Sequence, residues 1–470
     1  MKYELRIAGK FYDELYHHLF PGDGKEAVAI VLCGRHEAPG LSILLTHEIL
    51  LIPHNECERT PDSVSWKTNR VIPFLEQVEK KQFALLKIHS HPGGYARFST
   101  TDDTSDREFF TTVFNWSETK LPHASAIMLP DGRVFGRAIR TDLTTCSFSK
   151  ISCAGNQIRI WNNELQQIET DSKVDSFSTR NKQMLGNQTY HLLQQLSVGV
   201  VGCSGTGSPT IEQLCRLGVG QLVLVDPDKV EEKNLNRIIQ ARITDAKKER
   251  YKIDVMADAI QQIGLGTKVK GFPLNLFDSK DTLAALIKCD IIFGCVDSAE
   301  GRHLLSQLSN FYLIPYFDMG VQLNADGKGG IDSISGTGHY IQPGLSTLFS
   351  RHLYSQERLE AEGLLRQYPS EYAKRIKAGY IRNAIVDRPA VLPINMLISS
   401  MTVIDFLNRI HGHSFKEDGQ TQYARMLMDY SANCIENKSE NKFYIDIVAA
   451  KYTGRGDMKP FLRLTELDKL

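Results

Sequence analysis

The sequence predicts an α/β protein in two parts, and the second part is expected to contain a mostly parallel sheet. From about residue 179 to residue 412, apolar strand-like segments, glycine turns and helix-like segments repeat in turn, as in parallel sheets with crossover helices. Before residue 165, helix-like and strand-like segments form a separate group. The polar, aperiodic stretch 166–178 between the two groups is typical of a linker. At 470 residues, the chain is long enough for a core in each part.

The first domain is expected over residues 1–165. Its segments predict a helix at 11–20, strands at 26–34 and 41–52, a helix at 70–80 and a strand at 83–90. Strands at 124–130 and 132–139 are joined by Asp131-Gly132, a dipeptide typical of a tight hairpin. Residues 413–470 are expected to form an extension that packs on the second domain, with one strand at 442–450.

The composition excludes several classes of partner. Lys and Arg number 55, and Asp and Glu also number 55, so no net charge favours nucleic acid or an anionic membrane. No apolar run approaches the ~18 residues of a membrane span, and the N-terminal segment lacks the apolar core of a signal peptide. The nine cysteines are scattered without a Cys-x-x-Cys pair, which is typical of reduced thiols. We therefore expect a soluble, cytoplasmic protein.

The segment His89-Ser90-His91-Pro92, followed by Ser99 and Asp102, predicts a catalytic zinc site. Alternate residues of an extended segment point the same way, so His89 and His91 can face one cavity. Asp102 can provide a third ligand and leave the fourth tetrahedral position to water, as in catalytic zinc sites. Ser99 is close enough in sequence to Asp102 to stabilise a developing oxyanion, although a turn or cap role fits it equally well.

Hydrolysis of an amide also requires a group that transfers protons. Glu26 begins the apolar strand 26–34, an unusual position for a charge unless a cavity lies beside it. Glu37 and Glu48 are the alternatives for this role. The other nearby acids are interpreted as charges at a helix start rather than as metal ligands; they are Asp103 and Asp106.

The order His-x-His-Pro-x6-Ser-x2-Asp resembles the signature of the JAMM (JAB/MPN) metallopeptidases. These enzymes hydrolyse isopeptide or peptide bonds at the C-terminus of ubiquitin-like proteins. The resemblance implies an N-terminal JAB/MPN-like α/β domain with Zn²⁺ bound by His89, His91 and Asp102. It also implies that Glu26 is the catalytic glutamate, because residues 26–34 follow the family's Glu-x-x-x-φ-x-φ-x-Gly setting, where φ is apolar.

A second site is expected where the strand 198–201 runs into a glycine turn and then a helix. Gly202, Gly205 and Gly207 allow phosphate to approach the backbone, and the helix at Ser208 offers amides and a favourable dipole. The next strand ends at Asp226, where an acid can bind ribose hydroxyls. The polar residues that follow suit an adenylating enzyme, because departing pyrophosphate builds charge that cations must stabilise. They are Asp228, Asn234, Arg237, Lys252 and Asp297.

Residues 179–412 resemble the ThiF/ubiquitin-activating family of adenylyltransferases, which implies a Rossmann-like fold that binds ATP and Mg²⁺. The family's Gly-x-Gly-Gly-x-Gly-Ser occurs here from Gly202 to Ser208, with Ser204 in place of one glycine. Its Asp-x-Asp and Asn-Leu-x-Arg runs begin at Asp226 and Asn234.

The same resemblance implies a role for each polar residue. Asp226 is assigned to ribose and Asp297 to magnesium. Phosphates are assigned to Asn234, Arg237 and Lys252. The family also places an arginine, for which Arg180 is the candidate here, in the ATP site of a neighbouring subunit, which implies a homodimer.

Two departures from this family concern cysteine. The Cys-x-x-Cys pairs that hold a structural zinc in many relatives are absent, and Ser346 and Phe349 stand in place of the first pair. No cysteine lies between Cys295 and Cys434, although the crossover segment 345–392 is where a thioester-forming cysteine is expected. We therefore expect adenylation without a thioester on that segment; Cys434 can serve only if the tail folds back.

Three functions remain open. In the first, the chain is a two-activity enzyme of a bacterial ubiquitin-like system. It processes or removes a ubiquitin-like protein, adenylates its C-terminal glycine, and passes it to a separate conjugating enzyme. The second is activation of a sulfur carrier for cofactor or siderophore synthesis. In the third, an inactive nucleotide-binding half recruits the ubiquitin-like protein to the protease, and the complete set of phosphate-binding residues argues against this.

Overall fold

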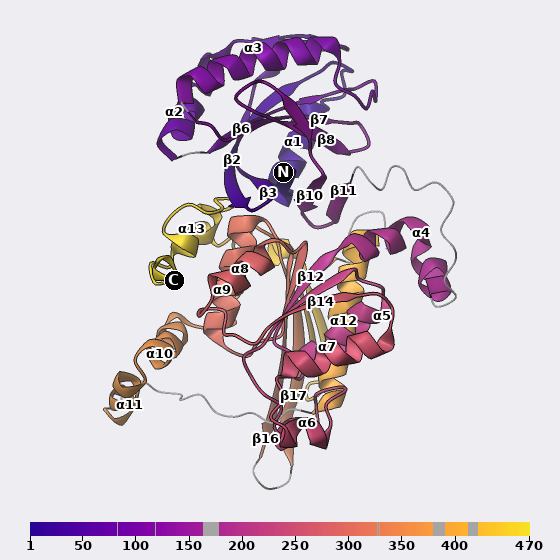
Figure 1. Ribbon diagram of the computed structural model, residues 1–470, viewed down its shortest axis with the longest axis vertical. Helices are drawn as coiled ribbons and strands as arrows, with labels where there is room; N and C mark the ends of the chain where they lie inside the picture. Colours follow the sequence, from indigo (N-terminus) through magenta and orange to yellow (C-terminus); the bar gives the residue numbers. More distant parts are fainter. Residues whose placement is uncertain are drawn as a thin grey trace. The chain divides into compact units, whose positions relative to one another are not determined.

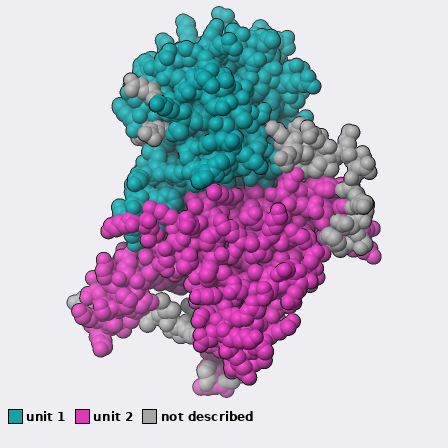
Figure 2. Space-filling model, in the orientation of Figure 1, with its two compact units in different colours: residues 1–171, 310–313, 448–468 teal, residues 172–309, 314–447, 469–470 magenta. Residues whose placement is uncertain are grey.

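The computed structural model describes residues 1–81, 83–117, 119–162, 178–326, 328, 330–378, 391–411 and 422–470. The chain divides into two compact units (Figure 2). Unit 1 comprises Met1–Asp171, Asn310–Leu313 and Val448–Asp468; unit 2 comprises Ser172–Ser309, Ile314–Ile447 and Lys469–Leu470. The linker predicted at 166–178 lies outside the described residues except for Ser178.

Unit 1 is built on a mixed sheet that, in the described part of the chain, has nine strands. Their order across the sheet is β11 (Ile158–Asn162), β10 (Lys150–Ala154), β1 (Lys2–Ala8), β3 (Leu41–Leu51), β2 (Val28–Ala38), β6 (Ala84–Ser90), β7 (His123–Met128), β8 (Val134–Ile139) and β9 (Thr145–Ser147). A separate hairpin is formed by β4 (Cys57–Thr60) and β5 (Ser63–Trp66).

Helices cover both faces of this sheet, as the long apolar strands require (Figure 1). Strand β2 alternates between the faces: Ala29 and Val31 belong to the core beneath α1 (Gly9–Leu19). Ile30 and Leu32 belong to the opposite core, which includes buried side chains of α2 (Ile72–Lys81) and α3 (Thr100–Ser117). The segment at the start of α3 therefore lies against the face of the sheet that carries the candidate metal site.

Unit 2 contains a sheet with the order β14 (Lys268–Phe272), β13 (Gln221–Val225), β12 (Ser197–Val201), β15 (Ile291–Gly294), β16 (Tyr316–Ala325), β17 (Ile331–Ile341), β18 (Arg425–Asp429) and β19 (Cys434–Lys438). In this order across the sheet, the first five strands, from β14 to β16, pair in parallel. Strands β17, β18 and β19 pair antiparallel with their neighbours. The predicted α/β class with parallel strands is confirmed.

The helices of unit 2 lie between and after these strands (Figure 1). They are α4 (Thr179–Gln195), α5 (Gly207–Arg216), α6 (Ile243–Lys247), α7 (Lys252–Ile263), α8 (Lys280–Ile287), α9 (Ala299–Tyr312), α10 (Gln356–Gln367), α11 (Pro369–Lys377) and α12 (Leu392–His411). The last residues of α9, Asn310–Tyr312, belong to unit 1. In the described part of the chain, no helix combines the length and apolar character needed to cross a bilayer.

The C-terminal extension differs from the expectation in two ways. Strands β18 and β19 join the sheet of unit 2, whereas Val448–Asp468 belongs to unit 1, so the predicted packing of 413–470 is corrected for that segment. Polar contacts hold Val448–Asp468 in unit 1: the Asp457 carboxylate accepts hydrogen bonds from the Tyr312 hydroxyl at 2.7 Å and the Glu37 amide at 3.1 Å.

The strand predicted at 442–450 is wrong. Its end forms a short helix, α13 (Ile447–Ala450), after an irregular stretch. Tyr444 is 84% exposed and Ile447 is 71% exposed, so the apolar residues do not alternate between a buried and a solvated face.

Replacement of Gly454 by alanine is expected to destabilise unit 1. Gly454 has φ of +65°, and a Cβ there would lie 2.0 Å from the Thr46 carbonyl oxygen. Backbone strain and steric overlap together predict that the free energy of unfolding falls by about 3 kcal/mol. Gly40→Ala is the matched control, because Gly40 has φ of +77° but open space around it.

Denaturant unfolding followed by tryptophan fluorescence measures this loss, because the chain's three tryptophans all lie in unit 1: Trp66, Trp116 and Trp161. Equal unfolding midpoints for Gly454→Ala and Gly40→Ala would contradict the packing of the C-terminal segment on β3.

Candidate functional site

The pairing of β2 with β6 brings Glu26 beside the two histidines. His89 lies opposite Val28 in the antiparallel ladder. The Ser90 amide donates to the Ala27 carbonyl at 3.0 Å, and the Ala27 amide donates to the Ser90 hydroxyl at 2.9 Å. Because Glu26 precedes Ala27, its backbone is fixed at the end of β6.

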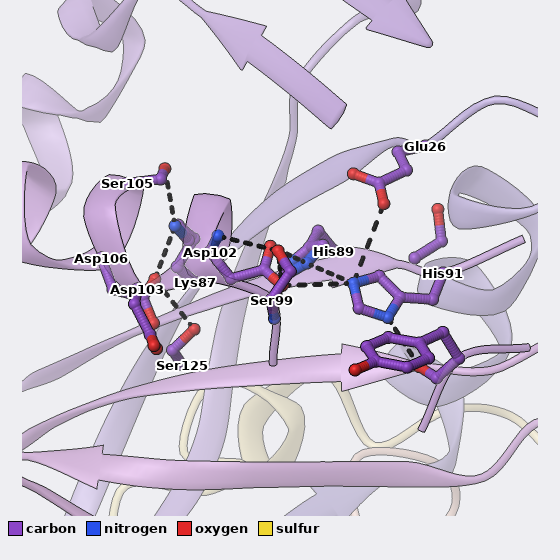
Figure 3. Close-up of polar contacts among 12 residues, drawn as sticks. Glu26, Lys87, His89, His91, Ser99, Asp102, Asp103, Ser105, Asp106 and Ser125 are labelled. Atoms are coloured by element: carbon purple, nitrogen blue, oxygen red, sulfur yellow. Dashed lines mark hydrogen bonds and ion pairs between the residues drawn. The ribbon is translucent and has the colours of Figure 1, made fainter. Parts of the chain in front are cut away.

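The three predicted ligands lie together at spacings close to those between the ligands of a tetrahedral zinc ion (Figure 3). The Nε2 atoms of His89 and His91 are 3.2 Å apart. Asp102 Oδ1 lies 3.0 Å from His89 Nε2, and Asp102 Oδ2 lies 3.5 Å from His91 Nε2. Bonds of about 2.0–2.1 Å at tetrahedral angles place donor atoms about 3.3–3.4 Å apart. The donor set and its spacing therefore fit one zinc ion.

The surroundings favour the ligand forms of His89 and Asp102. Burial alone would lower the pKa of His91, but its hydrogen bonds to Asp102 and to the Tyr95 carbonyl raise it. His91 Nδ1 is 2.7 Å from the Tyr95 carbonyl oxygen, which leaves Nε2 as the atom available to a metal. Burial lowers the pKa of His89, which favours its neutral form. Burial alone would raise the pKa of Asp102, but hydrogen bonds with His89, His91 and Ser99 hold it well below its usual range.

Glu26 has the position of a proton-transferring group. Its Oε1 lies 3.8 Å from His91 Nε2, and the side chain is only 5% exposed. Burial raises the pKa of Glu26 to about 7, which suits a group that both accepts and donates protons near neutral pH. One donor atom from each of Glu26, His89 and His91 lies within 4.8 Å of the others, so Glu26 is also close enough to contact a bound metal.

The alternatives to Glu26 lie elsewhere. Glu37 is near the other end of β2, where it accepts a hydrogen bond from Ser42. Glu48 is on β3 and accepts from Gln77.

Ser99 caps α3. Its hydroxyl donates to Asp102 Oδ2 at 2.8 Å and accepts from the Asp102 amide at 3.1 Å. This arrangement orients the Asp102 carboxylate; the oxyanion role of Ser99 stays a prediction.

A small cavity lies beside His89. It is lined by Glu26, Val28, Ser63, Val64, Trp66, Lys87, His89, Thr101, Asp102 and Ser105. The hairpin β4–β5 thus contributes one wall and the start of α3 another. Sequence reasoning missed Lys87, because no short motif distinguishes a lysine that lines a cavity from one on a solvated strand.

The glycine turn of unit 2 is packed so closely against neighbouring backbone that two of its positions require glycine. Gly202 has φ of +91°, and a Cβ there would lie 2.5 Å from the Cys295 carbonyl oxygen. A Cβ on Gly207 would lie 1.8 Å from the Gly202 carbonyl oxygen. Only glycine fits at both positions, and α5 begins at Gly207. Gly205 packs against Asn395, and the Ser208 hydroxyl accepts from the Ile239 amide at 3.1 Å.

Asp226 and Lys252 lie beside this turn. The buried Asp226 carboxylate accepts from the Cys203 amide at 2.7 Å and the Asp228 amide at 2.9 Å. Lys252 Nζ lies 2.7 Å from Asp228 Oδ2 and 3.8 Å from Asp226 Oδ1. Burial raises the pKa of Asp226, and the Lys252 charge opposes that shift. Each Asp226 oxygen keeps a lone pair for a further donor.

The other predicted residues have local partners. Asn234 Oδ1 accepts from the Glu231 amide at 3.1 Å, and Arg237 Nη1 donates to the Lys233 carbonyl at 3.0 Å. The exposed Arg180 bonds Gln183 at 3.3 Å. The Asp297 side chain is exposed, just beyond β15.

Helix α10 of the crossover segment holds the loop that carries Asp297. Arg358 Nη2 donates to the Asp297 carbonyl at 3.1 Å, and the Glu362 carboxylate accepts from the Glu300 amide at 3.0 Å. Arg366 forms an ion pair with Glu300 at 3.0 Å. Sequence reasoning missed these residues, because more than fifty residues separate the partners and no local pattern reports such a contact.

The cysteines nearest the glycine turn are poor nucleophiles. Cys203 is buried and Cys295 is half-buried, and burial raises the pKa of the Cys295 thiol to about 12. Cys434 is exposed on β19. The position expected for the first Cys-x-x-Cys pair is occupied by a polar cluster. The Ser346 hydroxyl donates to the Glu440 carboxylate at 2.5 Å, and Arg351 donates to the Ser346 hydroxyl and to the Glu440 carboxylate, each at 2.8 Å.

Comparison with known proteins divides the chain in the same way. The ThiF family profile matches residues 178–442, and the profile of prokaryotic homologs of the JAB domain matches residues 9–135. The ubiquitin-like modifier-activating enzyme 5 of Aedes aegypti is 27% identical over 231 residues, covering 46% of this chain and 54% of that protein. Its counterpart in Bombyx mori is 31% identical over 176 residues, covering 34% and 41%. The chain spans about half the length of these curated relatives.

Among solved structures, Escherichia coli MccB with succinimide is 17% identical to the chain. The match has a TM-score of 0.42 and covers 60% of this chain and 74% of that one.

Proposed function

Because the chain belongs to the ThiF family and also carries a segment that matches prokaryotic JAB domains, we propose that it is a two-activity enzyme of a bacterial ubiquitin-like system. Unit 1 is a zinc-dependent peptidase or isopeptidase that cleaves after the C-terminal glycine of a ubiquitin-like protein. Unit 2 adenylates that glycine. The observation that carries the proposal is the convergence of His89, His91 and Asp102 at zinc spacing on a chain that also has Lys252 beside Asp226 and the glycine turn.

In the peptidase site, His89, His91 and Asp102 would hold Zn²⁺. When bound, zinc lowers the pKa of a water and polarises the scissile carbonyl. Glu26 accepts a proton from the attacking water and delivers it to the leaving nitrogen, so that one carboxylate serves both halves of the reaction. Ser99 holds the Asp102 carboxylate and is the candidate donor to the developing oxyanion. The cavity between the β4–β5 hairpin and α3 receives the acyl part of the substrate.

In the nucleotide site, the partner's C-terminal carboxylate attacks the α-phosphorus of ATP. The bond to the β-phosphate oxygen breaks, pyrophosphate leaves, and an acyl adenylate forms. Asp226 accepts the ribose hydroxyls and the amides at the start of α5 approach the phosphates. Lys252, Asn234 and Arg237 are proposed to stabilise phosphate charge. The exposed Asp297 carboxylate suits Mg²⁺, which binds through one or two carboxylates and substrate phosphates.

The adenylate is proposed to pass to an external thiol, the cysteine of a conjugating enzyme. Residues 296–433 contain no cysteine, and Cys295 is half-buried with a raised pKa. The same absence favours one second candidate, transfer of sulfur to the activated glycine of a sulfur carrier. We also propose a cytoplasmic homodimer in which Arg180 completes the partner subunit's ATP site.

Glu26→Gln is expected to lower cleavage by about 10²–10⁴-fold while the zinc content per chain stays unchanged, because the amide keeps the shape but cannot accept the proton. The measurement uses ubiquitin-like proteins that carry a C-terminal fluorogenic amide. Glu37→Gln is the control at the other end of β2. Full activity of Glu26→Gln, or an equal loss in Glu37→Gln, would remove Glu26 from the mechanism.

Asp226→Asn is expected to weaken ATP binding by about 10–100-fold, because a charged hydrogen bond to ribose is lost. ATP-dependent pyrophosphate exchange with the ubiquitin-like partner should fall with it. Asp254→Asn removes an exposed carboxylate from the first turn of α7 and should leave ATP binding and pyrophosphate exchange unchanged.

In the same reactions, a non-reducing gel should contain no thiol-sensitive conjugate of the enzyme. A band that disappears in Cys434→Ala would refute transfer to an external thiol.

A further inference from the structure

Two acids on α3 face the sheet side by side. Asp102 and Asp106 are one helical turn apart, so their side chains lie on the same face of the helix. Asp102 reaches His89, and Asp106 reaches Lys87 (Figure 3). His89 and Lys87 are alternate residues of β6 and face the same side of the sheet.

The helix and the strand therefore meet through two matched contacts. Four residues of helix rise about 6.0 Å, and two residues of strand rise about 6.6 Å. This near equality lets the Asp102–His89 contact and the Asp106–Lys87 contact form together. A shift of α3 along β6 would break both contacts at once.

Three neighbouring strands hold the Asp106 carboxylate. Lys87 Nζ of β6 lies 2.6 Å from Oδ1, and the Ser125 hydroxyl of β7 donates to the same oxygen at 3.0 Å. Arg137 of β8 binds Oδ2 through Nη2 at 2.6 Å and Nε at 3.2 Å. The side chains of Lys87 and Asp106 are 5% and 4% exposed. Asp106, expected from the sequence to be a charge at a helix start, is thus a buried anchor.

Arg137 also holds the residues just before and after Asp102. Its Nη1 donates to Asp103 Oδ1 at 2.5 Å, and its guanidinium lies 3.8 Å from the centre of the Phe98 ring. Phe98 and Asp103 flank the segment that contains Ser99 and Asp102. One arginine on β8 therefore restrains the ligand-bearing segment on both sides.

We propose that Asp106, held by Lys87 and Arg137, is a positioning residue that fixes the register of α3 and so places Asp102 for zinc. This inference rests on the zinc site of the proposed function. Apolar packing attaches a helix to a sheet without defining its position along a strand, whereas directional ion pairs define it. The cluster is expected to control zinc affinity and coordination geometry although none of its members is a ligand.

Two variants of the full chain test the proposal. Arg137→Gln removes the outer cation, and the double variant Lys87→Met with Asp106→Leu replaces a buried ion pair by apolar side chains, so that no buried charge is left unpaired. Arg133→Gln is the matched control, because Arg133 forms an exposed ion pair with Asp131 next to β8. Circular dichroism and tryptophan fluorescence of the metal-free chains establish that each variant is folded.

Zinc affinity is measured by competition with a chromophoric chelator, and Co²⁺ absorption reports coordination geometry. Both test variants are expected to bind zinc about 10–100-fold more weakly and to lose intensity in the tetrahedral Co²⁺ bands. Arg133→Gln should match the wild type. Wild-type zinc affinity and Co²⁺ spectra in both folded test variants would overturn the proposal.

The same experiment separates this inference from the proposed activity. Weakened zinc binding in the variants, together with a wild-type chain that binds zinc but cleaves no ubiquitin-like amide, would support the positioning role and refute the peptidase. A wild-type chain that binds no zinc would overturn both.

Discussion

Two imidazole nitrogens lie 3.2 Å apart in a buried part of unit 1, and the two oxygens of the Asp102 carboxylate lie 3.0 and 3.5 Å from them. Two neutral imidazole nitrogens at this distance repel each other through their lone pairs unless a proton or a cation lies between them. The approach persists because β2 holds the end of β6 and because α3 is anchored through Asp106. Zinc, the cation we propose for this site, takes imidazole and carboxylate ligands at spacings close to these.

Unit 2 uses a different constraint, the convergence of strand ends in a parallel sheet. Strands β12, β13 and β15 run in parallel, so the turns that follow them meet at one edge of the sheet. Asp226 binds the amide of Cys203 in the glycine turn, and Lys252 binds Asp228, which links three segments into one site. Helix α10 fixes the loop of Asp297 from outside the sheet. The crossover segment therefore supports the proposed nucleotide site even though it carries no cysteine.

The parts of the sites that were predictable are those encoded in short stretches of sequence. His89 lies near the end of β6 and His91 directly follows that strand, Asp102 follows within a helical turn of Ser99, and the glycine turn is contiguous. The role of Asp106 was not predictable, because its partners lie on three strands that only the fold brings together. The same holds for Glu362 and its contact with the amide of Glu300.

The errors in the C-terminal region have a physical cause as well. An apolar run forms a strand only where a neighbouring strand is available, and 442–450 has none among the described residues. Residues 448–468 belong to unit 1, where the Asp457 carboxylate is hydrogen-bonded and where Gly454 and Gly456 lie against the backbone carbonyls of Thr46 and Arg35. No composition signal marks such a fit.

The central claim is most directly tested by the crystal structure of the zinc-bound protein, with the metal located by anomalous scattering at the zinc edge. We expect one ion about 2.0–2.1 Å from the Nε2 atoms of His89 and His91 and from one oxygen of Asp102. A water should occupy the fourth position within hydrogen-bond distance of Glu26. An ion bound by Glu26 instead of Asp102, or no ion at these histidines, would contradict the account.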